Sequence, residues 1–320
     1  MNAVNKMYLY FFRLILVSPL FFLFYYPAEF NLDYEAYLIN YENDYWRYDV
    51  LYVAFSQCLK YLFNLSFDQF LIVYLLVMLM IVPLVYRRFS VIVIAIPSLV
   101  SMSQYFYGTQ LRYALASLIF LTLLTQAYSS KKHIIVGGVS IFLHYGMAFA
   151  MLVMFVSKYI DRGSLYINKI KFWFLFFGSL SSIYIVKEVV IILISYTRFS
   201  YYTTDSVYLS FRSISSISYM LVVFVLLAAH YSSTSERKLV DSFIFKFSYV
   251  LVIVILVTSP IAVLSSRLNL IYFIIEPLII FLIFLDKSQL LLVRLLLPFM
   301  MLFRVGLDLF FWDFHFYNVL

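Results

Sequence analysis

The sequence predicts an all-α, polytopic membrane protein, a bundle whose helices cross a bilayer about nine or ten times. Hydrophobic residues make up 65% of the 320 positions, and the mean hydropathy is +0.96. Charged residues make up only 12%, about half of the usual share in a soluble domain. The apolar runs are about 20 residues long, which is the length that a helix needs to span the hydrocarbon core.

The apolar runs give the expected spans in chain order. The first, 7–26, contains Arg13 and lacks a small-residue cleavage site, so we expect a retained signal-anchor. The others are expected at 67–86, 89–107, 111–128, 173–194, 214–231, 243–264, 268–285 and 290–311. We expect a single integral membrane domain over 1–320, because no repeat, linker or soluble segment interrupts the pattern.

Two polar segments are expected on the outside face. In the first, 27–66, an acidic stretch is followed by a short apolar helix at 50–64, which we expect to lie at the interface. Tyrosines recur in the acidic stretch at spacings of three and four, which predicts an amphipathic helix: Tyr34, Tyr37, Tyr41, Tyr45 and Tyr48. The second polar segment is the aromatic loop 195–213.

Residues 133–160 are too long for one simple span, and they contain His144-Tyr145-Gly146. A single crossing would place Lys131-Lys132 and the basic loop 158–171 on opposite sides. A turn near His144 would place both on one side, which the positive-inside rule favours. We therefore expect a re-entrant or broken segment near His144.

With a cytoplasmic N-terminus, cations outnumber acidic residues inside, whereas acidic residues outnumber cations outside. The net charge of +7 therefore reflects topology, and no nucleic-acid partner is expected. The expected outside cations are Arg47, Lys60, Arg112, Arg198, Arg212 and Arg267. Arginines at span ends are often merely interfacial, or they pair with acidic loops. As a set, they favour a phosphate or pyrophosphate site, because guanidinium groups bind phosphate in a bidentate manner.

Three further residues are candidates for acid–base chemistry. His144 is either a helix histidine bonded to a backbone carbonyl, or an acid, base or phosphate ligand at a wet turn. Asp33 and Glu35 form a D-x-E pair that could bind a metal, supply a general base, or belong to a solvated loop. No second acidic cluster completes a metal site, so no metal is expected.

Glu276 is a carboxylate in the middle of a predicted span. It could relay protons in a transporter, or pair with Arg294 or Arg304 of the last span. The single Cys58 rules out an internal disulfide. Nucleotide-binding glycine patterns do not occur, so cytoplasmic nucleotide chemistry is unsupported.

A series of short motifs resembles the EpsG/Wzy type of polysaccharide polymerase, the O-antigen polymerase kind, over nearly the whole chain. The motifs are Asp33…Tyr37, Asp49-Val50-Leu51, Leu111-Arg112-Tyr113-Ala114-Leu115-Ala116, Phe142-Leu143-His144 and Ser266-Arg267-Leu268…Tyr272-Phe273. The chain departs from the family at Tyr113, where glutamine is usual, and at Asp49, where glutamate is frequent.

The resemblance implies a GT-C-like glycosyltransferase membrane fold in the bacterial inner membrane, with its active face periplasmic or extracellular. The enzyme would transfer a growing glycan from undecaprenyl pyrophosphate to a new lipid-linked repeat unit, in O-antigen, exopolysaccharide or capsule synthesis. It would need no cofactor. Its partners would be the lipid-linked donor and acceptor, membrane lipid and, in addition, a chain-length regulator protein.

The resemblance and the outside arginines together define the expected site. The first candidates for binding pyrophosphate are Arg112 and Arg267, and the second are Arg198 and Arg212. Tyr37 and Tyr272 would contact substrate, and the catalytic candidates are Asp33, Glu35 and His144. Three alternatives stay open: a flippase or transporter of lipid-linked sugars that uses Arg112 and Glu276, an O-antigen ligase, and a membrane acyltransferase. The acyltransferase would need a cytoplasmic site, whereas His144 is expected outside.

Overall fold

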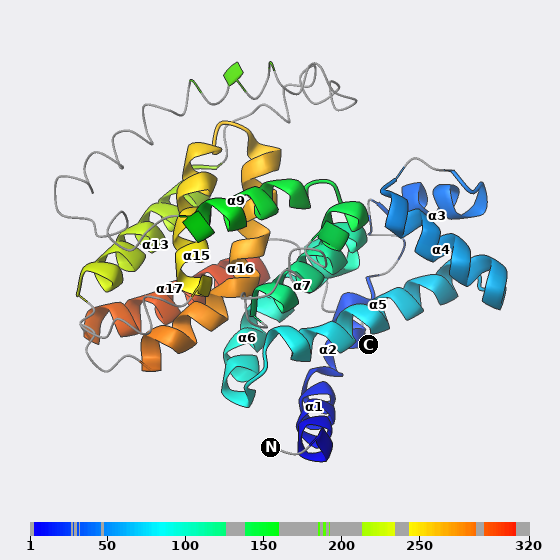
Figure 1. The fold of residues 1–320 in the computed structure, drawn as a ribbon, viewed down its shortest axis with the longest axis horizontal. Coiled ribbons are helices and arrows are strands. Elements are labelled where there is room, and N and C mark those ends of the chain that lie inside the picture. Colours follow the sequence, from blue (N-terminus) through cyan, green and yellow to red (C-terminus); the bar gives the residue numbers. More distant parts are fainter. Residues whose placement is uncertain are drawn as a thin grey trace. The chain divides into compact units, whose positions relative to one another are not determined.

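The structure is a computed structural model. It describes residues 3–26, 28, 31, 33–45, 48–125, 138–159, 185, 188–189, 192, 213–233, 243–285 and 291–311. All regular elements within these ranges are helices, as predicted (Figure 1). The chain forms two compact units, Met1–Met151 with Met301–Leu320, and Leu152–Met300. The single membrane domain stays a prediction.

Two of the described helices, α5 (Phe67–Val85) and α16 (Ala262–Leu285), are long and apolar enough to cross a membrane. Several shorter described helices are also apolar: α4 (Val50–Phe63), α6 (Phe89–Ser101), α7 (Leu111–Thr125), α9 (Met147–Tyr159), α13 (Ile214–Ser233) and α15 (Phe243–Val257). This composition is compatible with a helical membrane protein. The number of spans and the GT-C-like arrangement stay predictions.

The first predicted span is not one helix. The structure has α1 (Ala3–Val17) and α2 (Leu20–Phe24), with a turn at Ser18-Pro19. Proline lacks the backbone N–H and clashes with the carbonyl four residues earlier, so a helix is interrupted there. The Ser18 hydroxyl donates to the Ile15 carbonyl at 2.8 Å, which satisfies the last turn of α1. The single continuous helix predicted at 7–26 was therefore wrong, whereas the membrane crossing by these residues stays a prediction.

Arg13 of α1 is tied to the end of α5. Its guanidinium donates to the backbone oxygens of Pro83, at 3.4 Å, and Arg87. Its Nε also donates to the Leu9 oxygen at 2.8 Å. The end of α5 leaves carbonyls without helical donors, so the arginine satisfies them while they compensate its charge.

The predicted amphipathic helix in the acidic stretch is shorter than the tyrosine spacing indicated. Helix α3 covers Tyr34–Glu42, and the backbone then turns through Asp44, whose φ is +54°. The short apolar helix was predicted well, because α4 covers Val50–Phe63. Asn64 ends α4 in the left-handed conformation, with φ of +51°.

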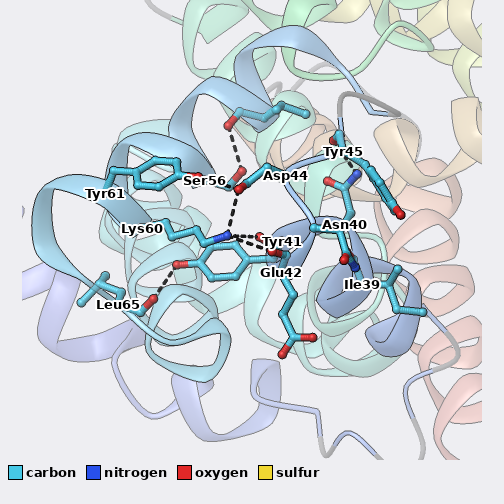
Figure 2. Close-up of polar contacts among 12 residues, drawn as sticks. Ile39, Asn40, Tyr41, Glu42, Asp44, Tyr45, Ser56, Lys60, Tyr61 and Leu65 are labelled. Carbon is cyan, nitrogen blue, oxygen red and sulfur yellow. Dashed lines mark hydrogen bonds and ion pairs between the residues drawn. The ribbon is translucent and has the colours of Figure 1, made fainter.

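Lys60 of α4 joins these two helices (Figure 2). Its ammonium donates to the carbonyls of Tyr41 (2.8 Å) and Glu42 (3.1 Å) at the end of α3, and to the Asp44 carboxylate (2.8 Å). The Tyr61 hydroxyl donates to the other Asp44 oxygen at 2.5 Å. Hydrogen bonds from Lys60 and Tyr61 lower the pKa of Asp44. Lys60 is thus a structural cation that caps α3.

Helix α6 was predicted to continue to residue 107. Instead it ends at Ser101, and the chain continues as a π-helix, η2 (Ser103–Gly108), before α7 begins. Within the first unit α5 packs beside α7 (Figure 1), and α2 packs against η2. The Asn31 side-chain amide donates to the Gly108 oxygen at 3.0 Å. These contacts fix the start of α7, and with it the position of Arg112.

The second unit contains the later part of α9, all of α13, α15 and α16, and the first part of α17 (Leu291–Phe311). The predicted boundary between spans 243–264 and 268–285 was wrong. Helix α15 ends at Val257, the chain turns around Pro260, and α16 begins at Ala262. Arg267 therefore lies inside a helix rather than in a loop. The predicted span 173–194 and loop 195–213 lie almost wholly outside the described residues.

Candidate functional site

Arg112 is the second residue of α7 and has a buried carboxylate partner. Its Nη1 donates to Asp49 Oδ2 at 2.5 Å, and the exposed fractions of the two side chains are 20% and 4%. Its Nε donates to the Tyr37 hydroxyl at 3.5 Å. A charged pair with so little solvent is strongly coupled, because water screens it weakly.

Three tyrosine rings surround the Arg112 guanidinium. Its Cζ lies 3.9 Å from the ring centre of Tyr48, 5.7 Å from that of Tyr37 and 5.8 Å from that of Tyr52. Tyr37 and Tyr52 are buried, and their ring centres are 5.7 Å apart. Burial raises the pKa of Tyr37, so its hydroxyl stays neutral near pH 7. We call Arg112, Asp49 and these three tyrosines the arginine cage; its rings stabilise the cation by cation–π interaction.

Asp49 links the arginine cage to the predicted turn at His144. It is the N-cap residue of α4, and its Oδ1 accepts the backbone N–H of Tyr145 at 3.0 Å. The carboxylate therefore holds Arg112 of α7 with one oxygen and the 144–146 segment with the other. The sequence identified Asp49 only as a motif residue and not as a site residue. An acidic residue directly before a short apolar helix was the available signal.

His144 lies where the chain leaves the helical conformation. Residues 138–143 are helical, residues 144–146 are not, and α9 begins at Met147. The break predicted near His144 is confirmed, whereas a re-entrant path through the membrane stays a prediction. The ring centre of His144 lies 4.8 Å from that of Tyr113, the neighbour of Arg112. The structure thus brings Arg112 and His144 into one region of the first unit.

The hydrogen bonding of His144 bears on its chemistry. Its Nδ1 accepts the backbone N–H of Gly146 at 3.0 Å. In a neutral imidazole, an accepting Nδ1 leaves the proton on Nε2, which is then a donor. In this arrangement His144 is suited to donate a hydrogen bond to an anion, and less suited to accept a proton.

Asp33 and Glu35 flank the start of α3. Asp33 is its half-buried N-cap residue, and it contributes to the raised pKa of Tyr37. Glu35 is exposed in the first turn. Between them, the Tyr34 hydroxyl donates to Asp68 at 2.6 Å, and burial together with this bond raises the pKa of Tyr34 to about 12. Of the two carboxylates, Asp33 is the one whose charge acts on Tyr37 of the arginine cage.

Of the remaining predicted residues, two belong to the second unit. Arg267 is half-buried in α16, and Tyr272 is buried further along the same helix. Arg198 and Arg212 lie outside the described residues. Within the described residues, no group of three or more His, Cys, Asp and Glu side chains is arranged to hold a metal ion.

The charged residues in the late helices have local partners. Glu276 is fully buried and accepts a hydrogen bond from the Tyr219 hydroxyl. Arg294 donates to the Phe284 oxygen at 3.0 Å. Arg304 pairs with Asp308 at 2.9 Å and donates to the Ser98 hydroxyl at 2.8 Å. The sequence left open whether Arg294 or Arg304 pairs with Glu276. In the structure each of the three side chains has the other partners named above.

No known protein family, curated protein or solved structure matches this chain. The arginine cage and the motifs of the chain are therefore the features that bear on its function.

Proposed function

We propose that this protein is a membrane glycosyltransferase that polymerises undecaprenyl-pyrophosphate-linked oligosaccharide repeat units. The observation that carries the proposal is the arginine cage, a guanidinium held in a mostly buried, tyrosine-lined site near a histidine whose Nδ1 accepts the Gly146 N–H, which leaves Nε2 able to donate. The motif resemblance to EpsG/Wzy polymerases supports the same activity. The site would face the periplasm or the exterior of a bacterial inner membrane.

The proposed reaction transfers the growing glycan from its carrier to a new repeat. An acceptor hydroxyl oxygen attacks the anomeric carbon of the donor sugar, and the bond from that carbon to the pyrophosphate oxygen breaks. The electron pair leaves with the pyrophosphate, whose negative charge increases as the bond breaks. Arg112 stabilises this charge better in a partly dry site than it would in water, and the His144 N–H adds a hydrogen bond.

The proton of the acceptor hydroxyl needs a base. Asp33 is our first choice because it is half-buried and lies near Tyr37, whereas the exposed Glu35 is better placed to orient the acceptor. Tyr37 stays in the proposal as a substrate contact of the arginine cage. The roles that the sequence predicts for Arg267, Arg198 and Arg212 with pyrophosphate, and for Tyr272 with substrate, stay predictions, since these residues lie in the second unit or outside the described residues. A chain-length regulator protein is a proposed partner.

Replacing Arg112 by alanine tests the proposal in cells. We expect surface glycan from the Arg112→Ala strain to lose its ladder of long chains and to retain single repeat units on gels. Arg294→Ala is the matched control, because the described contacts of Arg294 are with the backbone oxygen and the ring of Phe284, away from any carboxylate. A normal ladder at matched protein levels in the Arg112→Ala strain would contradict the assignment.

A flippase or transporter of lipid-linked sugars is the second candidate. The buried Glu276, bonded to Tyr219, favours it, because intramembrane carboxylates often relay protons. Loss of a flippase should remove all surface glycan, whereas loss of a polymerase should leave single repeats. A ligase mutant would instead retain long polymer on the carrier lipid.

A further inference from the structure

Asp49 has two partners that come from separate segments of the first unit. One carboxylate oxygen accepts from Arg112, 63 positions away, and the other accepts from the Tyr145 backbone, 96 positions away. The side chain is 4% exposed, so water contributes little to its solvation. Any movement of this carboxylate therefore changes both the arginine cage and the 144–146 segment.

The pair that Asp49 forms with Arg112 is electrically neutral as a unit. An incoming pyrophosphate would meet the carboxylate as well as the guanidinium, and like charges placed together in a dry site cost several kcal/mol. Anion binding to Arg112 is therefore favourable only if Asp49 moves away or loses its charge.

The helix that follows offers Asp49 another position. Asp49 has the extended backbone of an N-cap residue, with φ of −68° and ψ of 140°, but its side chain makes no capping bond. Aspartate is among the best N-cap residues, because its carboxylate can accept backbone N–H groups of the first turn. The same carboxylate therefore has two competing sets of donors. One set is the Arg112 guanidinium and the Tyr145 backbone N–H, and the other is the backbone N–H groups of the first turn of α4.

We propose that Asp49 is a positioning residue that couples anion binding at Arg112 to the segment carrying His144. When pyrophosphate takes the place of the carboxylate on Arg112, Asp49 rotates to cap α4 and releases the Tyr145 N–H. The 144–146 segment then adjusts so that His144 can bind the same anion. The identity of the anion rests on the proposed function, whereas the competition between Asp49 and the anion does not.

Binding of inorganic pyrophosphate to the purified protein tests the competition. Asp49→Asn keeps the shape of the side chain and removes its charge, so we expect pyrophosphate to bind about tenfold more tightly than to the wild type. Polymerisation should nevertheless fall, because the coupling to His144 is lost. Asp44→Asn is the matched control, since Asp44 pairs with Lys60 away from Arg112, and it should leave pyrophosphate affinity unchanged. Equal or weaker binding by Asp49→Asn would overturn the proposal.

Hydrogen exchange of the wild-type protein tests the coupling without any variant. Adding inorganic pyrophosphate should speed exchange of the Tyr145 amide, because Asp49 no longer accepts its hydrogen bond. A merely structural Asp49 would leave this amide protected, and unchanged exchange at saturating pyrophosphate would overturn the coupling. The proposed function fails separately, if Arg112→Ala cells still make long glycan while both pyrophosphate results hold.

Discussion

At Arg112, two kinds of contact compensate a charge that is costly in an apolar protein. Asp49 supplies a charge-assisted hydrogen bond at 2.5 Å, and Tyr48 supplies a ring face 3.9 Å from Cζ. A buried pair alone often gains little, because desolvation offsets the Coulomb attraction. The binding role proposed for Arg112 would explain why both contacts surround a charge at the start of α7.

Replacing His144 by asparagine separates the roles of its two ring nitrogens. In His144→Asn the side-chain oxygen can replace Nδ1 as acceptor for the Gly146 N–H, whereas the Nε2 donor is lost. We therefore expect its thermal unfolding to resemble that of the wild type, while the yield of long glycan falls at least tenfold. His144→Ala should in addition lose about 1 kcal/mol of stability with the turn hydrogen bond. Wild-type glycan from His144→Asn would remove the histidine from the proposed mechanism.

The sequence identified Arg112 and His144 because a charge or an imidazole in an apolar run is costly and therefore informative. It could not identify the Asp49 pair in the same way. That contact joins residues 63 positions apart, and it depends on how α4 and α7 are rotated and offset. Such long-range register follows from packing and not from local pattern.

The junction between η2 and α7 positions the arginine cage. Gly108, the last residue of η2, is packed closely against its neighbours at this junction. A Cβ at Gly108 would lie 2.7 Å from the Cβ of Tyr26 and 2.8 Å from the Phe24 oxygen. Gly108→Ala should therefore destabilise the protein by about 1–3 kcal/mol, as overpacking does elsewhere. Thermal unfolding in detergent measures this effect.

Gly306 of α17 is the matched control for this substitution. A Cβ there meets no heavy atom within 4 Å, so Gly306→Ala should be neutral, or stabilising by up to about 1 kcal/mol through helix propensity. Equal unfolding temperatures for the two variants would argue against the close packing of η2 on the segment that follows α2.

Helix bounds were predictable where the apolar pattern and the end signals agreed. Helix α4 and α5 were placed to within one or two residues, since polar residues and Ser66 mark their ends. The break at Pro19 was missed and the break at Pro260 was misplaced, because the apolar run continues through each proline. In both places local proline geometry outweighed hydrophobic periodicity.

For the whole molecule, the central expectation is the topology, and it follows from charge asymmetry. Reporter fusions at Lys131 and Ser200 should report opposite sides of the membrane, with Lys131 cytoplasmic. The apolar composition and the helices α5 and α16 support membrane insertion. Fusions that report the same side would contradict the placement of the arginines on the outside face.

The most direct measurement of the central claim is polymerisation by the purified protein in lipid vesicles. Supplied with undecaprenyl-pyrophosphate-linked repeat units, the wild type should form glycans of two or more repeats and release undecaprenyl pyrophosphate in proportion. The Arg112→Ala protein should form none above background, while Arg294→Ala should match the wild type. Absence of extension by the wild type, or equal extension by Arg112→Ala, would contradict the account.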